Sequence, residues 1–425
     1  LVWLVLPTVF EKLVPVRILA LILGFGSVAT LYGGWRAFYF QSSFLAPIAY
    51  ITDERPTADR FASLLGTTPD SLLTGIHVFH DFGISYYWGT LRNPWVENEM
   101  DFWPNHSPLA MLMGRFWQNF DYLIASQLNV LAMAILMLIP IVIATLRRPW
   151  HIKVLALAAV LLSGPFIAAL DRGNYQGYIP VLLFGFGYFA LKGRWGWAAA
   201  MIVIAASLKV YPIILSLVLI AERRWRATFA TVVGGFAGNV VMLFAFSGPI
   251  TETARMYFLE AGKILGLPDL LSYNISFVGG VLHWLQFYGA SGAVGLLSSQ
   301  PSFLVAVGFL LIAPIVWMRR SVPLVIRIVV AFFLTTLATP IVFPYTANWA
   351  IAALALVLMT SESEHQPLMH SDRGSAATKP QVVAVSLAVS MVLAFTPVFI
   401  PGTVEGGYPA GAQSLVAPVV AILFA

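Results

Sequence analysis

Long runs of apolar residues recur along almost the whole sequence and leave few folds open to it. They fall at residues 17–40, 121–146, 154–170, 176–191, 197–221, 227–246, 302–318, 322–339, 346–360, 381–400 and 413–425. An α-helix needs about 20 such residues to cross a bilayer. Only 10% of the 425 residues are charged, well below the share of a soluble domain. The sequence therefore predicts an all-α polytopic membrane protein, a bundle of about 11–13 transmembrane helices.

The basic residues predict the side of the membrane on which each loop lies. Most of the 24 Lys and Arg residues lie in the flanks at 11–17, 147–153, 192–194, 222–226, 319–327 and 361–380. Basic residues near span ends stay in the cytoplasm, so these flanks are predicted to be cytoplasmic. Residues 41–120 then form a large first extracytoplasmic loop. The polar linker 361–380 separates a main membrane module, residues 1–360, from C-terminal helices in residues 381–425.

Several function classes have no support in the sequence. The net charge of +5 is spread over short loops without a basic run, so no nucleic-acid partner is expected. The absence of cysteine excludes disulfides and thiolate metal sites. His77, His80 and His106 lack the spacing typical of metal ligands, which favours isolated histidines. No phosphate-binding loop or dinucleotide fingerprint is present.

One membrane segment is predicted to be broken. About 25 residues separate the cytoplasmic flanks 192–194 and 222–226, and Lys209-Val210-Tyr211-Pro212 lies in the middle. Pro212 removes a backbone donor and disfavours helix at the residue before it. We therefore expect two half-length helices that turn near Lys209. Such breaks occur where the backbone faces protein or a water-filled cavity.

Four polar clusters are predicted to lie on the outer side. They are His80 and Asp81 with Tyr86, Tyr87, Trp103 and His106; Asp171, Arg172 and Asn174; Lys209 and Tyr211; and Tyr273 to Ser276. Charged groups at membrane depth cost about 2.5–3.5 kcal/mol each and need partners or water. Arg172 and Lys209 around one cavity suit a phosphate-bearing ligand. Two alternatives stay open: Asp171 and Arg172 as a structural ion pair, and Lys209 extended toward the interface.

Three blocks in this order resemble a known family. The first runs from Leu170-Asp171-Arg172-Gly173-Asn174 through Lys209-Val210-Tyr211-Pro212 to Arg223-Arg224-Trp225. The second is Asn274-Ile275-Ser276-Phe277-Val278-Gly279, and the third is Thr339-Pro340-Ile341-Val342-Phe343-Pro344-Tyr345. Over roughly residues 75–360 the chain resembles the polytopic glycosyltransferases of the GT-C superfamily. It is most similar to glycosyltransferase family 87, which includes actinobacterial polyprenyl-phosphate-mannose-dependent α-mannosyltransferases.

The resemblance implies a fold, a reaction and a set of site residues. It implies a GT-C-like bundle whose first extracytoplasmic loop carries short amphipathic helices. It also implies inverting transfer of a hexose, commonly mannose, from a polyprenyl-phosphate donor, with Asp81 matching the general base. Where the family often has a histidine, this chain has Tyr345. Expected phosphate-binding residues are Arg172, Lys209, Tyr211, Asn274 and Tyr345; expected supporting residues are Asp171, Asn174, Tyr86, Tyr87, His80, Trp103 and His106.

The expected setting is the plasma membrane, with a glycolipid or polysaccharide acceptor on the extracytoplasmic face. No metal or other cofactor is expected, because the leaving phosphate needs charge stabilisation that Arg172 and Lys209 would supply. A transporter or flippase for lipid-linked sugars is the main alternative, since broken helices with buried charges are typical of transporters. An inverted repeat would favour that alternative, and none is found. A non-catalytic scaffold is the second alternative.

Overall fold

The computed structural model describes residues 80–98, 106–263, 278–279, 282, 285, 292, 301–317, 322–339 and 344–360. Within these ranges every regular element is helical. The spans predicted at 17–40, 381–400 and 413–425, most of the first loop and the linker 361–380 lie outside them. So do Trp103 and Asn274.

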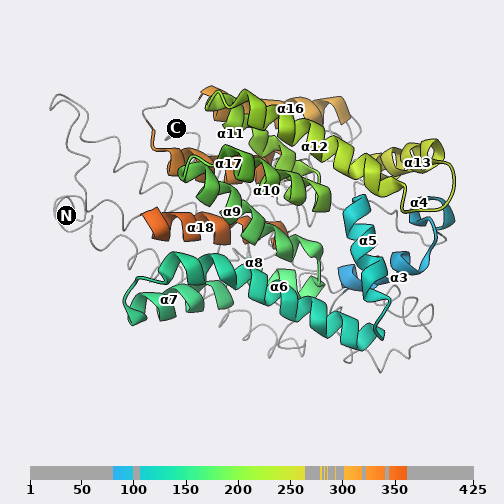
Figure 1. Cartoon of the computed structure of the whole chain (residues 1–425), viewed down its shortest axis with the longest axis horizontal. Helices are drawn as coiled ribbons and strands as arrows, with labels where there is room; N and C mark the ends of the chain where they lie inside the picture. Colours follow the sequence, from blue (N-terminus) through green and yellow to red (C-terminus); the bar gives the residue numbers. More distant parts are fainter. Residues whose placement is uncertain are drawn as a thin grey trace.

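The long helices lie side by side (Figure 1). They are α6 (Tyr122–Thr145), α9 (Ile179–Leu191), α10 (Trp195–Leu208), α12 (Trp225–Leu243), α16 (Pro301–Trp317), α17 (Leu324–Ala338) and α18 (Trp349–Thr360). Each lies largely within one of the predicted apolar runs. The helix α18 packs against α6, α9 and α17 and is buried along almost its whole length, so it forms the centre of the main core.

The outer faces of these helices are apolar. Leu131 on α6 and Phe229 and Phe236 on α12 are exposed by 57%, 70% and 66%. Exposed apolar faces of this extent are suited to lipid rather than water. Within the described residues two helices, Ile124–Thr145 and Trp225–Leu243, are long and apolar enough to cross a bilayer, and several apolar helices are shorter. The protein is an all-α membrane protein.

One predicted span is in fact two helices. The run 154–170 was expected to be continuous, whereas the structure has α7 (Trp150–Leu161) followed by α8 (Gly164–Arg172). Ser163 caps α8, because its hydroxyl accepts a hydrogen bond from the backbone N–H of Phe166. Pro165 then occupies the first turn, where its missing donor costs nothing. A Ser-Gly-Pro sequence inside an apolar run is therefore a helix start.

The expected break at Lys209 is present. The helix α10 ends at Leu208, and Lys209 has an extended backbone with φ −145° and ψ 132°. A short 3-10 helix, η3 (Tyr211–Leu215), and the short helix α11 (Ser216–Ala221) follow. Two further 3-10 helices precede long helices: η2 (Tyr175–Tyr178) before α9 and η6 (Pro344–Asn348) before α18.

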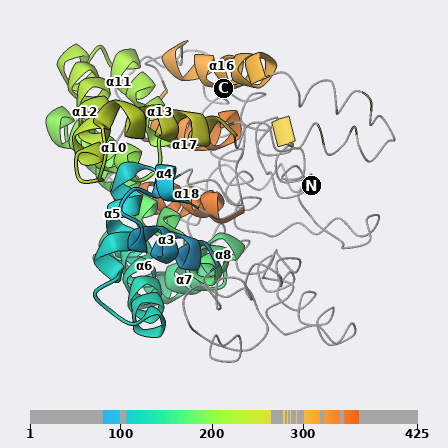
Figure 2. The same ribbon diagram turned by 90° about the vertical axis from the view of Figure 1, so that its right-hand side faces the viewer.

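Four further helices gather at one end of this bundle, as Figures 1 and 2 show. They are α3 (His80–Thr90), α4 (Pro94–Glu97), α5 (Pro108–Trp117) and α13 (Ile250–Lys263). The helix α5 is amphipathic, as expected of this loop, but α3 is buried on all sides. One side of α3 joins the main core through Phe82 and Tyr86, and another joins a second cluster through Ile84, Tyr87 and Trp88.

Hydrogen bonds attach these outer elements to the rest of the fold. The Asn93 amide donates to the backbone carbonyl of Ser247 at 2.7 Å and to the hydroxyl of Thr253 at 2.8 Å. The Arg115 guanidinium donates to the carbonyl of Ala245 at 2.7 Å. No apolar run predicted α13, because its first turns mix Thr, Glu and Arg with apolar residues. The described short helices are thus fixed to the bundle by side-chain hydrogen bonds.

Candidate active site

The turn after α8 is shaped by a glycine. Gly173 has φ 60° and ψ 20°, a left-handed conformation that ends α8 at little steric cost. Arg172 is therefore the last residue of α8, and Asn174 caps η2 by accepting a hydrogen bond from the backbone N–H of Gln176 at 2.9 Å. The Asp-Arg-Gly-Asn sequence thus places a guanidinium and an amide on either side of a tight turn.

Both of those side chains reach Asp81, about 90 residues earlier in the chain. The Asn174 amide donates to Asp81 Oδ2 at 2.6 Å, and Arg172 Nη1 lies 3.5 Å from Asp81 Oδ1. Asp81 lies in the first turn of α3, where the helix dipole favours a carboxylate. The side chains of Arg172 and Asp81 are 8% and 15% exposed, so the pair is sheltered without being sealed.

Arg172 has hydrogen-bonding capacity left over. Its Nε and Nη1 atoms are buried and have no acceptor among the described residues. The contact with Asp81 is an ion pair longer than a charge-assisted hydrogen bond. The sequence left open a structural pair between Asp171 and Arg172; the described partner of Arg172 is Asp81. The side chain of Asp171 lies outside the described part of the structure.

Lys209 and His106 complete the group. The half-buried Lys209 ammonium interacts electrostatically with the Asp81 carboxylate and with His106. His106 is buried between Trp88 and Tyr175, at ring-centroid distances of 5.2 and 6.5 Å. Burial lowers the pKa of His106 to about 3, helped by Lys209 and opposed by Asp81. His106 is therefore a neutral imidazole beside two charged groups.

The other predicted residues are placed differently. The Tyr86 hydroxyl donates to the carbonyl of Phe120 at 2.8 Å, and Tyr87 packs in the second cluster. The Tyr211 ring stacks on Trp349, with a distance of 5.4 Å between the ring centroids. The Tyr211 hydroxyl donates a hydrogen bond to the side-chain oxygen of Gln176. The side chains of His80 and Tyr345, like all of Trp103 and Asn274, lie outside the described part. The roles assigned to these residues stay predictions.

Three polar residues around this group were assigned no role from the sequence. Ser107 donates its hydroxyl to the carbonyl of Leu208 at 2.9 Å, next to Lys209. Gln176 and Asn348 are fully buried, and the side-chain amide of Asn348 donates to the backbone carbonyl of Gln176 at 2.9 Å. The signal that could have found Gln176 and Asn348 is polarity, since each is an amide at the edge of an otherwise apolar run.

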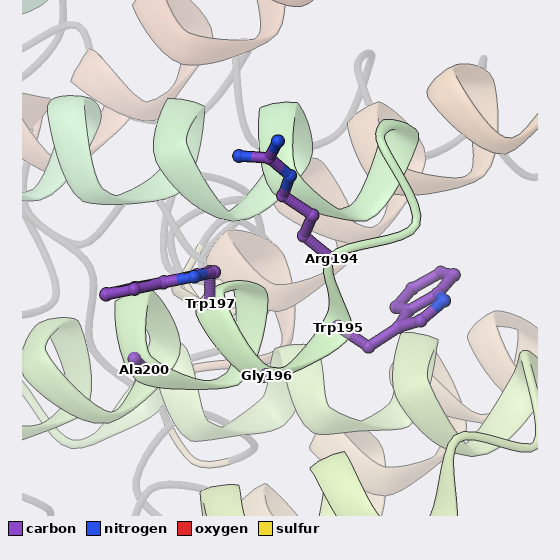
Figure 3. A pocket seen from close by; sticks show the side chains of 5 residues that line it. All are labelled: Arg194, Trp195, Gly196, Trp197 and Ala200. Atoms are coloured by element: carbon purple, nitrogen blue, oxygen red, sulfur yellow. The ribbon is translucent and has the colours of Figure 1, made fainter.

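A surface hollow lies far from this group. Figure 3 shows it at the start of α10, lined by Arg194, Trp195, Gly196, Trp197 and Ala200. Lys209 follows the other end of α10, roughly 20 Å away along the helix axis at 1.5 Å per residue. Trp195 and Trp197 beside a basic residue are typical of a membrane interface. The hollow is therefore no part of the Asp81 group.

Comparison with known proteins places the chain in a family. The model of glycosyltransferase family 87 matches residues 82–340, more than half of the chain. The chain belongs to glycosyltransferase family 87. The match holds Arg172, Asn174 and Lys209, begins one residue after Asp81 and ends before Tyr345. No curated protein and no solved structure matches it significantly.

Membership of family 87 makes the protein a membrane glycosyltransferase, with a sugar donor and an acceptor as substrates. The Asp81 group is the place in the described structure where a carboxylate, a guanidinium, an ammonium and an imidazole converge. Within the described residues no group of three or more His, Asp and Glu is arranged to hold a metal ion.

Proposed function

We propose that this family 87 enzyme is a hexosyltransferase that uses a polyprenyl-phosphate sugar, with mannose as the favoured sugar. It transfers the sugar with inversion to a glycolipid or polysaccharide of the cell envelope. The enzyme is a multi-pass protein of the plasma membrane, and its reaction takes place on the extracytoplasmic face. The observation that carries this proposal is the meeting of Asp81 with Arg172 and Asn174 in a chain that belongs to glycosyltransferase family 87.

The chemistry fits these groups. A carboxylate oxygen of Asp81 takes the proton of the acceptor hydroxyl as the oxygen of that hydroxyl bonds to the anomeric carbon. The bond from the anomeric carbon to the phosphate oxygen breaks, and its electron pair leaves with the lipid phosphate. General-base assistance contributes about 10²–10⁴-fold. The polyprenyl phosphate departs as an anion, so it needs positive charge and no proton.

Arg172 and Lys209 are the proposed source of that charge. Arg172 suits a phosphate group, because guanidinium donates to phosphate oxygens and its Nε has no acceptor among the described residues. Because Arg172 also contacts Asp81, the donor phosphate would lie next to the base. His106 remains neutral at this position, so Arg172 and Lys209 are the proposed cations of the site.

Replacement of the proposed base is the direct test. Asp81→Asn keeps the size of the side chain and removes its basicity, so transfer from radiolabelled polyprenyl-phosphate mannose to lipid acceptors should fall at least about 100-fold. Asp121→Asn is the matched control, because Asp121 is an exposed carboxylate at the start of α6 without a capping bond. Full turnover by Asp81→Asn would remove Asp81 from its role. Movement of the lipid-linked sugar across the membrane without transfer would favour the transporter.

We also propose that the reaction needs no divalent metal, since the two cations of the chain supply the charge. Transfer should keep its full rate in excess EDTA, measured with the same donor and acceptors. Loss of activity in EDTA that Mg²⁺ or Mn²⁺ restores would contradict this.

A further inference from the structure

Two 3-10 turns and the turn at the Asp81 group are connected through one residue. Gln176 lies in η2, its backbone carbonyl accepts a hydrogen bond from Asn348 at the end of η6, and its side-chain Oε1 accepts one from the Tyr211 hydroxyl of η3. Its backbone N–H donates to Asn174. These partners belong to segments that are separated by about 30 to 170 residues in sequence.

The two ends of this connection are the proposed phosphate-binding segments. Asn174, one residue before η2, holds Asp81 and follows Arg172 by two residues. Tyr211 follows Lys209 by two residues, at the break between α10 and η3. A short chain of bonds through Gln176 therefore links the backbone near Arg172 to the backbone near Lys209.

The break at Lys209 needs such support. An extended residue between two helices leaves backbone groups without helical partners. Ser107 satisfies the carbonyl of Leu208 from one side, and Gln176 holds Tyr211 from the other. The side chain of Gln176 is completely buried, so water does not replace this bond easily.

We propose that Gln176 is a positioning residue, which holds the Lys209 segment in register with Arg172 so that both cations meet the same donor phosphate. This inference rests on the proposed function. Misplacement of a binding group by about 1 Å costs about 100-fold in catalysis, so loss of the Gln176 bond should be visible in kinetics.

The chain offers an informative pair of substitutions. Gln176→Met keeps the volume and removes the acceptor for Tyr211. Gln176→Glu keeps an acceptor oxygen for Tyr211, and burial at this position favours the neutral acid form of the new side chain. It forfeits no existing bond, because Nε2 of Gln176 has no partner among the described residues. Thr231→Val is the matched control. Thr231 is also fully buried, but its hydroxyl bonds only within α12, to the carbonyl of Ala227.

The experiment measures kcat, the KM for polyprenyl-phosphate mannose, the KM for the acceptor and the unfolding temperature of each variant. Gln176→Met should raise the donor KM about tenfold or more, with the acceptor KM and unfolding temperature near those of Thr231→Val. Gln176→Glu should restore the donor KM to within about threefold of wild type. Tyr211→Phe should raise the donor KM at least as much as Gln176→Met, because it removes the same bond and also the contact of its hydroxyl with Thr346. The double variant should be no worse than Tyr211→Phe, because the Gln176 bond is already lost there.

Two outcomes would overturn the inference. One is an unchanged donor KM in Gln176→Met. The other is a lower kcat with a rise in the donor KM and the acceptor KM alike, together with a lower unfolding temperature. Failure of the positioning role is distinguished from failure of the proposed function by measuring how tightly the same variants bind polyprenyl monophosphate, which carries no sugar. If wild type transfers no sugar but binds the monophosphate about tenfold tighter than Gln176→Met, the reaction is wrong and the positioning role stands. If wild type transfers no sugar and binds the monophosphate no more tightly than Gln176→Met does, or not at all, both the proposed reaction and the positioning role are wrong.

Discussion

At the scale of single residues, the site places the neutral imidazole of His106 next to charged side chains. Asp81 is held through both carboxylate oxygens, by Arg172 and Asn174. His106, near the same carboxylate, is kept neutral by burial and by Lys209. A second positive charge at His106 would repel Lys209 and require hydration that the buried site does not offer. The site is therefore built for neutral His106.

Acid should destabilise the protein through His106. Its folded pKa of about 3 lies below the unfolded value near 6.5, so the unfolded state binds the proton first as pH falls. The stabilising contribution is complete above pH 6.5 and is lost progressively toward pH 3. Between pH 7 and pH 5 the free energy of unfolding should fall by about 2 kcal/mol from this residue.

Unfolding of the purified protein between pH 8 and pH 4 measures this effect. His106→Gln, which does not titrate, should have a flatter profile than wild type. His151→Gln is the control, because His151 is exposed on α7, and its profile should follow wild type. A His106→Gln profile as steep as that of wild type would contradict the assignment.

At the scale of elements, the site depends on where helices stop. The Ser163 cap and the extended Lys209 each start or end a helix inside what reads as a continuous apolar run, and the left-handed Gly173 ends a helix between two such runs. The contact between α3 and α5 is the other requirement, because α3 carries Asp81 and α5 follows His106. Gly89 and Gly114 lie at this contact, and a Cβ on Gly114 would overlap the carbonyl of Ser85.

Gly114→Ala should therefore displace α3 from α5. Overpacking of this kind costs about 1–3 kcal/mol, and the shift should reduce transfer more than tenfold because Asp81 moves with α3. The measurements are unfolding temperature and transfer rate. Gly196→Ala is the control, since a Cβ there meets no atom within 4 Å. Wild-type stability and rate in Gly114→Ala would show that α3 tolerates a wider spacing.

At the scale of the whole molecule, the Asp81 group and the outer elements share one end of the bundle, and the start of α10 lies at the other (Figure 1). The proposed reaction requires the first end to face outward. Because the chain has no cysteine, single cysteines report on this directly. Asn119→Cys, exposed between α5 and α6, should react with an impermeant maleimide in intact cells. Lys192→Cys, exposed between α9 and α10, should react only after the membrane is permeabilised. The reverse labelling pattern would show that the end of the bundle with the Asp81 group faces the cytoplasm.

Sequence alone determined the class of fold, most helix positions and the residues worth examining. Apolar runs long enough for a bilayer leave only a helical membrane protein, because a backbone in lipid must satisfy its own hydrogen bonds. Pro212 beside Lys209 predicted the break, since proline acts locally. Arg172 and Lys209 stood out because charged groups are costly at membrane depth, and Asp81 stood out as the match to the general base of the family that the chain resembles.

Only the tertiary structure decided which of these residues meet. Periodicity and composition report on neighbours along the chain, whereas the contact of Asp81 with Asn174 joins residues 93 positions apart. The same limit hid the Ser163 cap in an apolar run, the burial of α3 on all sides and the role of Gln176 as a junction. Tyr86 and Tyr87 illustrate it best, because adjacent tyrosines on one helix point in different directions and enter different cores. Local sequence specifies where helices lie, but packing between distant helices specifies which side chains share a site.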